Sequence, residues 1–117
     1  MNETGFLLLT DGTPTLAQAA LAAFPRLRVA PLNGDTRLVK PGGRVFCFID
    51  WLLPDLSGLE MVRRLRDRTD TAFSHITMVL EEDDGESRRR ALRAGADDYI
   101  AGPLTPARLV ERLALYL

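Results

Sequence analysis

Short apolar runs alternate with stretches of helical periodicity along the whole chain, and this alternation limits the possible folds more than any other feature. The runs cover residues 6–9, 27–32, 45–49, 76–80 and 99–101. Between them, apolar residues recur every three or four positions, as they do in an amphipathic helix. Strict alternation favours a parallel sheet with helices on both faces, because each parallel crossover needs a helix. The sequence therefore predicts an α/β domain of five strand and helix pairs.

Turn and capping residues set the expected element boundaries. Thr13 or Thr15 can begin the first helix and Pro25 ends it, while Ser57 precedes another helix. Gly95 is well placed to end the helix predicted over 86–94. A helix is also predicted over 33–39, and it should be short or irregular because Pro41 and Gly42 follow it. The last helix is predicted after Pro103, where Leu109, Val110, Leu113 and Leu117 recur with helical period. Pro31, in the second strand, would sit best at a sheet edge or at the end of the strand.

Length and composition indicate a single soluble domain over residues 1–117. The chain is 46% hydrophobic and 26% charged with a net charge of -1, which suits one buried core and argues against an extended nucleic-acid surface. The apolar run 6–9 is far shorter than the roughly 20 residues of a membrane span, so we expect a cytoplasmic protein. Cys47 and His75 are each the only residue of their type, which excludes an internal disulfide and argues strongly against structural zinc.

Two aspartates follow predicted strands. Asp11 comes just after the run 6–9, and Asp50 comes directly after 45–49, the most apolar strand signal of the chain. Carboxyl ends of parallel strands meet at one edge of a sheet, so these carboxylates should converge there. Two carboxylates at such an edge can hold a hard divalent cation. The alternative is that both aspartates only cap their loops.

Two segments resemble response-regulator receiver domains. Asp50 is followed by Pro54 four residues later and by Gly58 four residues after that, which is the receiver spacing around the phosphorylated aspartate. The stretch 95–100, followed by Pro103 and a helix, resembles the end of receivers of the OmpR/PhoB subfamily. The resemblance covers the whole chain, apart from a compressed region between Leu32 and Val45. It implies a five-stranded doubly wound parallel sheet of the flavodoxin-like or CheY-like receiver fold.

The same resemblance implies a chemistry for Asp50. In such receivers a histidine kinase donates a phosphoryl group to the aspartate, and Mg²⁺ assists the transfer. The implied ligands here are Asp11, Asp50 and the backbone carbonyl of Leu52. Asp50 would be the nucleophile, and the metal would neutralise charge on the phosphoryl group.

Three positions depart from the receiver pattern. Thr10 replaces the first residue of the acidic pair, Leu80 stands where a Ser or Thr hydroxyl is usual, and Gly102 replaces the lysine before Pro103. The only lysine of the chain, Lys40, precedes the third strand and should lie at the opposite end of the sheet from Asp50. We therefore expect weak Mg²⁺ binding and doubtful phosphotransfer, because a missing charge-stabilising group costs on the order of 100-fold in rate.

The resemblance also suggests a dimer surface built from the helix at 86–94, the strand at 99–101 and the last helix. Receivers of this subfamily dimerise through a set of charged side chains. The residues at the corresponding positions here are Arg90, Asp97, Asp98, Arg108 and Arg112, and of these Arg108 stands where an acid is usual. Exposed pairs of this kind set register more than they add energy. The alternative is that these charges are an unpaired solvated surface.

Three functions remain open at this point. The leading hypothesis is an atypical receiver, not an enzyme, that acts in signal transduction or transcription regulation through protein contacts and homodimerisation, with any DNA-binding output domain outside this chain. A second hypothesis is a slow but genuine phosphoacceptor at Asp50, served by a histidine kinase. A third is a pseudo-receiver that binds a cyclic dinucleotide through the basic run Arg88 to Arg90. Trp51, beside the acceptor, is expected to be a packing residue rather than a ligand platform.

Overall fold

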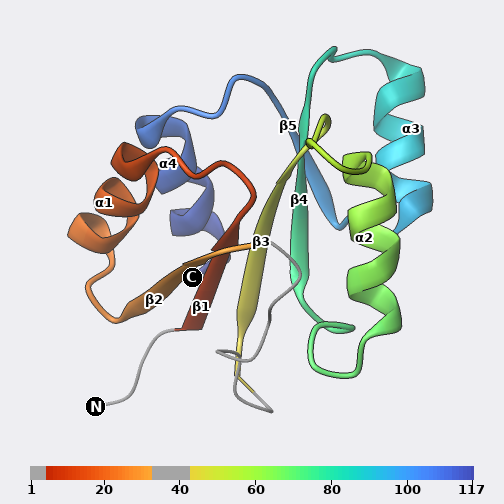
Figure 1. The fold of residues 1–117 in the computed structure, drawn as a ribbon. Helices are drawn as coiled ribbons and strands as arrows, with labels where there is room; N and C mark the ends of the chain where they lie inside the picture. The colour runs from red at the N-terminus through yellow and green to blue at the C-terminus, as the bar shows by residue number, and fades with distance from the viewer. Residues whose placement is uncertain (1–4, 33–42) are drawn as a thin grey trace.

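The computed structural model describes residues 5–32 and 43–117 and contains one parallel sheet in that part of the chain (Figure 1). The strand order is β2-β1-β3-β4-β5. The strand after β1 is added on one side of it and the later strands are added on the other side, so the order of the strands reverses between β1 and β3. The strands are β1 (Gly5–Leu9), β2 (Leu27–Pro31), β3 (Val45–Asp50), β4 (His75–Leu80) and β5 (Asp98–Ala101). The predicted five-stranded doubly wound sheet is confirmed.

Helices cover both faces of the sheet (Figure 1). The described helices are α1 (Pro14–Ala23), α2 (Gly58–Asp67), α3 (Gly85–Ala94) and α4 (Pro106–Tyr116). Figure 1 shows α1 and α4 on one side of the sheet and α2 and α3 on the other. The helix predicted over 33–39, and Lys40 after it, lie outside the described residues. Within residues 5–32 and 43–117, no helix is long and apolar enough to cross a membrane.

Alternating side chains of the strands fill two separate cores, as the pleat of a strand requires. Ile49, Met78 and Leu80 pack with α2 and α3 in what we call the α2/α3 core. Phe48 and Val79 pack with α1 and α4 in the α1/α4 core. The central strands are therefore buried on both faces, and Thr77 of β4 is a buried polar residue within them, with its hydroxyl in contact with Tyr116.

Most element boundaries agree with the expected signals to within one or two residues. Ser57 caps α2 by accepting a hydrogen bond from the backbone N–H of Glu60 at 3.2 Å. Gly95 ends α3 at a φ of 120°, a conformation that glycine adopts without strain. Two details differ: β3 includes Asp50 itself, and Leu117 lies just beyond the end of α4.

Candidate functional site

Asp50 is the last residue of β3 and is held there by both neighbouring strands. The backbone N–H of Thr10 donates to Phe48 O at 3.2 Å, and that of Trp51 donates to Val79 O at 3.1 Å. Gly58 passes so close behind that a Cβ atom on it would collide with the carbonyl oxygen of Asp50. The spacing from Asp50 to Gly58 therefore has a steric reason, since only glycine permits this approach.

Thr10 and Asp50 form a reciprocal pair of hydrogen bonds. The Thr10 hydroxyl donates to Asp50 Oδ2 at 2.8 Å, and it accepts the backbone N–H of Asp50, also at 2.8 Å. The register of β1 beside β3 brings the two residues together. One carboxylate oxygen of Asp50 is thus already hydrogen-bonded to the neutral side chain of the residue that follows β1.

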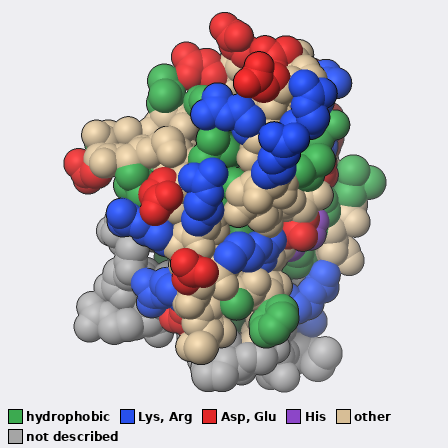
Figure 2. Space-filling view, turned by 90° about the vertical axis from the view of Figure 1, so that its right-hand side faces the viewer, with side chains coloured by type: hydrophobic (Ala, Val, Ile, Leu, Met, Phe, Trp, Pro, Cys, Tyr) green, Lys and Arg blue, Asp and Glu red, His purple; other side chains and the backbone are tan. Residues whose placement is uncertain are grey.

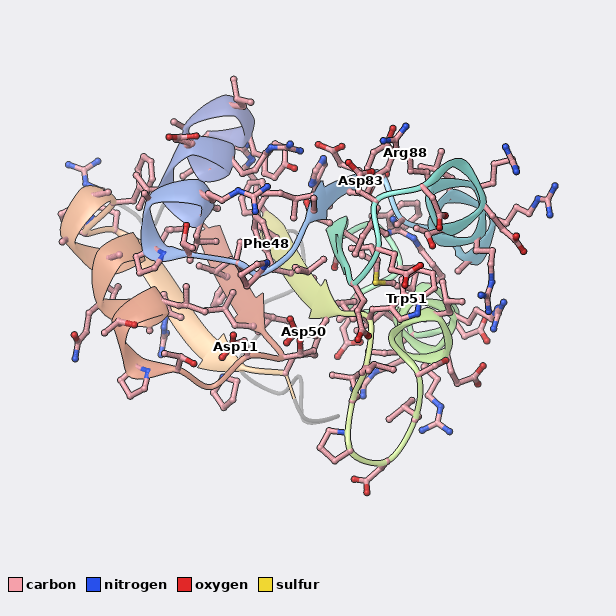
Figure 3. All side chains as sticks on the ribbon, turned by 90° about the horizontal axis from the view of Figure 1, so that it is seen from above. Asp11, Phe48, Asp50, Trp51, Asp83 and Arg88 are labelled. Atoms are coloured by element: carbon pink, nitrogen blue, oxygen red, sulfur yellow. The ribbon has the colours of Figure 1, made fainter. Side chains whose placement is uncertain are left out.

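Asp11 lies beside Asp50, at the carboxyl ends of the strands (Figure 3). Its Oδ1 atom accepts hydrogen bonds from the backbone N–H of Thr13 at 2.9 Å and from the Thr13 hydroxyl at 2.6 Å. Asp11 therefore stabilises the loop before α1, in agreement with the loop-capping alternative. The hydroxyl of Thr13 serves this contact and makes no cap bond of its own to α1.

The electrostatic surroundings of Asp50 are unfavourable to its charge. Burial raises the pKa of the Asp50 carboxyl, the hydrogen bond from Thr10 lowers it, and the negative charge of Asp11 raises it, so that the net pKa is raised. Across residues 5–32 and 43–117, no arginine forms a hydrogen bond or an ion pair with Asp50. The site combines a partly buried carboxylate with a second acid and, among the described side chains, no cation.

A cavity of about 440 Å³ opens beside Asp50 at the carboxyl ends of β3, β4 and β5. Its lining is mainly apolar, and its carboxylates come from β3 and from the acidic loop after β4. The lining residues are Asp50, Trp51, Leu52, Val79, Leu80, Glu81, Gly102 and Pro103. The ends of β3 and β4 and the segment that follows β5 thus line the cavity, and few of their side chains are polar.

The cavity has a leucine, Leu80, where receivers usually have a hydroxyl, and a glycine, Gly102, where they usually have a lysine. Leu80 has no exposed surface and is a member of the α2/α3 core. Gly102 donates its backbone N–H to Leu80 O at 2.8 Å, and a Cβ atom on Gly102 would lie 2.9 Å from that same oxygen. Any larger residue at position 102 would therefore require β4 or β5 to shift.

Arg108 does not replace the missing lysine. Its guanidinium donates to the carbonyl oxygen of Ala101 and, at 3.1 Å, to that of Pro103. These two carbonyls flank Gly102, so Arg108 fastens α4 to the loop after β5. The nearest later cation in the sequence thus has a structural contact and no contact with Asp50.

The residues present do not fit a Mg²⁺ site of the kind that the resemblance implied. Asp11 and Asp50 each have one carboxylate oxygen in an intramolecular hydrogen bond. Leu52 forms an isolated bridge with Ser57 and is 67% exposed. Within the described ranges, no group of three or more His, Cys, Asp or Glu side chains is arranged to hold a metal ion. Mg²⁺ prefers an octahedral set of oxygens, and two partly engaged carboxylates supply little of it.

The residues expected on a dimer surface are bonded within the chain. Asp98 accepts hydrogen bonds from Arg112 Nη1 at 2.8 Å and from the Tyr116 hydroxyl at 2.9 Å. Asp97 pairs with Arg66 at 2.8 Å and also accepts the backbone N–H of Ile76. The sequence did not single out Tyr116 or Arg66 as partners of these acids. Tyr116 did carry a signal, because it continues the helical stripe of Leu109 and Leu113.

The arginines of the basic run 88–90 contact different partners. Arg88 pairs with Asp83 at 2.6 Å, and its guanidinium lies over the Tyr99 ring at 5.7 Å (Figure 3). Arg90 lies over the Trp51 ring, 5.4 Å from its centre. Trp51 itself packs against the α2/α3 core. The run does not converge on one site, which gives no support to cyclic dinucleotide binding.

The sequence is similar to one protein family and to several known proteins. The family model of the response regulator receiver domain matches residues 36–114. The phosphate regulon regulatory protein PhoB of Rhizobium meliloti is 35% identical over 88 residues, which cover 74% of this chain and 39% of PhoB. The chemotaxis protein CheY1 of Helicobacter pylori is 31% identical over 87 residues, covering 73% of this chain and 62% of CheY1. The matched part thus spans well under half the length of PhoB.

Solved structures show the same fold. The response regulator DrrB of Thermotoga maritima, an OmpR/PhoB homologue, superimposes with a TM-score of 0.72 at 25% identity, over 99% of this chain and 52% of DrrB. The chemotaxis protein CheY4 of Vibrio cholerae gives a TM-score of 0.71 at 21% identity, over 97% of this chain and 98% of CheY4. Sequence and fold therefore agree, and the chain belongs to the response regulator receiver domain family.

Proposed function

We propose that this receiver domain transmits its signal in a two-component pathway through protein contacts, with little or no conventional phosphorylation of Asp50. The reciprocal hydrogen bonds between Thr10 and Asp50, in a site without a described cation, carry this proposal. The role is regulatory rather than enzymatic and belongs to the cytoplasm. Contact with DNA would require an output domain, as expected from the sequence.

The chemistry of phosphoryl transfer explains why the site matters. The transition state spreads negative charge over the phosphoryl oxygens, and enzymes stabilise it with cations and fixed donors. At Asp50 the incoming group would meet the charges of Asp11 and Glu81, with a leucine and a glycine where a hydroxyl and an ammonium usually stand. Like charges a few ångströms apart in a partly buried site cost several kcal/mol, on the order of a thousandfold or more in rate.

Dimerisation is the second part of the proposal. We expect a homodimer through α3, β5 and α4, with a histidine kinase or another signalling protein as a further partner. Asp98 and Arg112 are already paired with each other, so the dimer would rely on a different set of side chains from the one the resemblance suggests. Arg90 and Arg108 lie on the same elements and carry charge that an adjacent copy can contact.

Beryllofluoride is the sharpest probe of the proposal, because it mimics an aspartyl phosphate without a kinase. A structure of the beryllofluoride-activated DrrB receiver domain provides a positive control of the same fold. Trp51 is the only tryptophan and adjoins Asp50, so its fluorescence reports directly on the site. With beryllofluoride and Mg²⁺ present, fluorine NMR should show a bound fluoride signal for the DrrB receiver and none for this protein or for its Asp50→Asn variant, and the fluorescence of Trp51 should stay unchanged.

A restored variant tells a blocked site from an insensitive reporter. Thr10→Asp removes the hydroxyl that bonds Asp50 and adds the missing acid, so this variant should show Mg²⁺-dependent quenching of Trp51 that the wild type lacks. Thr10→Ser, which keeps a hydroxyl, is the matched control and should behave as the wild type. Saturable modification of wild-type Asp50 by beryllofluoride or acetyl phosphate, at the rate of the DrrB control, would contradict the proposal.

Slow phosphorylation of Asp50 is a second candidate function, and one observation favours it. Asp50 Oδ1 has no hydrogen bond within the described structure, and the cavity of about 440 Å³ gives access to the residue. Incubation with a histidine kinase and labelled ATP tests this function. Labelling that accumulates over hours and disappears in Asp50→Asn supports it, whereas an unlabelled protein excludes it for that kinase.

A further inference from the structure

One arginine fixes the loop that follows α2. The guanidinium of Arg66 donates to Ala72 O at 2.9 Å and to Ser74 O at 2.6 Å. It also donates twice to Gly95 O, from Nε at 2.9 Å and from Nη2 at 2.7 Å. Thr71 adds a buried hydrogen bond from its hydroxyl to Leu65 O at 2.7 Å. The loop is thus fastened both to α2 and to the end of α3.

Phe73 lies in this loop between Ala72 and Ser74, whose carbonyl oxygens both accept hydrogen bonds from Arg66. Its side chain is 98% exposed, the highest value among the large hydrophobic residues described. A phenylalanine left in water forgoes about 1.5–3 kcal/mol of burial energy. The backbone on either side of the ring is fixed by these hydrogen bonds, so the loop itself loses little conformational entropy when a partner covers Phe73. Aromatic side chains are common anchors of protein interfaces.

The helix beside this loop is strongly basic. α3 carries four arginines and one glutamate, and Arg93 lies in its last turn, two residues before Gly95. Arg89 and Arg93 are exposed and form no ion pair with any described residue. Figure 2 shows arginine side chains spread over the face that α2 and α3 present, with acidic side chains gathered at its upper end. Arg93 therefore places an unpaired positive charge at the end of α3 that Arg66 links to the loop of Phe73, and Arg89 lies one turn before it on the helix. The acid at this end, Asp97, is paired with Arg66.

We propose that Phe73, Arg89 and Arg93 form a docking surface for an acidic segment of a partner protein. An apolar residue of that segment would cover Phe73, and its carboxylates would pair with the two arginines. Charge complementarity of this kind speeds association and fixes register, while the aromatic anchor supplies most of the affinity. The surface does not include Asp50 and is independent of the proposed function.

The acidic loop at the other end of α3 favours a protein segment over a nucleic acid. Its exposed side chains are Glu81, Glu82, Asp83 and Asp84, and Glu86 follows in the first turn of α3. A long polyanion laid along α3 would meet these carboxylates and be repelled, whereas a short acidic segment can end before them. The chain's net charge of -1 also gives no general attraction for polyanions.

A labelled peptide tests the surface directly. The probe is a short synthetic helix of glutamates with leucine at every fourth position, and fluorescence anisotropy measures its binding to the full chain. We expect Phe73→Ala and Arg93→Glu each to weaken binding by about tenfold, the loss of one interface anchor. Leu115→Ala and Arg26→Glu are matched controls, because Leu115 is 78% exposed on α4 and Arg26 is exposed before β2. Both controls should bind within about twofold of the wild type.

Competing probes decide between the classes of partner. A short DNA duplex and phosphatidylserine vesicles are titrated in parallel with the peptide. Either probe bound more tightly than the peptide, with the same loss in Arg93→Glu, would overturn the proposal in favour of a polyanion. Equal peptide binding by the wild type and the Phe73→Ala variant, or no binding at all, would overturn it as well. Asp50→Asn should leave peptide binding unchanged, which separates this result from the fate of the phosphorylation site.

Discussion

Two aspartates on the sheet, Asp50 on β3 and Asp98 on β5, have opposite surroundings. Asp50 meets one hydroxyl, a second acid and an apolar cavity, and its pKa is raised mainly by burial. Burial also acts on Asp98, but the backbone N–H of Tyr99, the Tyr116 hydroxyl and the Arg112 charge outweigh it and lower the pKa. The fold thus compensates one carboxylate fully and leaves the other poorly compensated. An uncompensated carboxylate in a cavity is characteristic of a functional site, whereas a satisfied one is characteristic of a structural network.

Strand β4 contributes to both surroundings and shows how the difference arises. Thr77 faces α4, and its hydroxyl lies 2.8 Å from the hydroxyl of Tyr116. Tyr116 gives its own proton to Asp98, so Thr77 is the donor of that bond. Three residues further on, Leu80 faces the opposite core and offers no polar atom at the Asp50 end. β4 therefore has a hydroxyl group in the network of Asp98 and a leucine side chain at the end near Asp50.

The largest expected effect comes from placing a hydroxyl at the Asp50 end of β4. Leu80→Thr removes apolar volume from a side chain with no exposed surface and buries a polar group in the α2/α3 core. We expect a loss of about 2–4 kcal/mol in the free energy of unfolding, measured by urea denaturation. Leu115→Thr, at an exposed position, should cost under about 0.5 kcal/mol. A loss below about 1 kcal/mol for Leu80→Thr would show that the core tolerates a receiver-like hydroxyl there.

A smaller effect is expected from removing the cation of the Asp98 network. Arg112→Met should cost about 1–2 kcal/mol near pH 7, less than a fully buried charged hydrogen bond because both side chains are about one-third exposed. The pKa of Asp98 is lowered in the fold, so its contribution is complete above the ordinary value of 3.8 and is lost as pH falls through the folded value. Urea titrations should therefore show the variant and the wild type converging in acid.

The control for this prediction is an exposed ion pair on α2. Arg64 lies 3.6 Å from Glu60, with side chains 64% and 44% exposed. Arg64→Met should cost under about 0.5 kcal/mol at any pH, because exposed pairs contribute little. Equal losses for Arg64→Met and Arg112→Met would mean that the Asp98 network contributes no more than an ordinary surface pair.

Periodicity and turn signals were enough to predict the strands, most helix boundaries and the placement of Asp50 at the carboxyl end of β3. They report which residues are buried, and burial is a local property of the pattern. The partners of polar side chains depend on register between distant segments, so the bond from Thr10 to Asp50 and the contacts of Arg66 were not predictable. Exposure of Phe73 was equally hidden, because an apolar residue in a loop gives no signal of its direction. The helix predicted over 33–39 remains a prediction.

The smallest expected effect is a gain, and it comes from removing the charge of Asp50. The folded pKa of Asp50 is raised, so the folded state keeps its proton to higher pH than the unfolded state does, and the carboxylate costs stability once pH rises through the folded value. Asp50→Asn still accepts the hydrogen bond of Thr10 but carries no charge. We expect a gain on the order of 1 kcal/mol or less near pH 7, because solvent still reaches this charge and screens it, and the gain should vanish in acid below the ordinary pKa. Asp98→Asn should show the opposite sign in the same titration. If Asp50→Asn instead loses stability near neutral pH, then Asp50 is compensated by groups outside its described contacts, and the contrast between the two carboxylates fails.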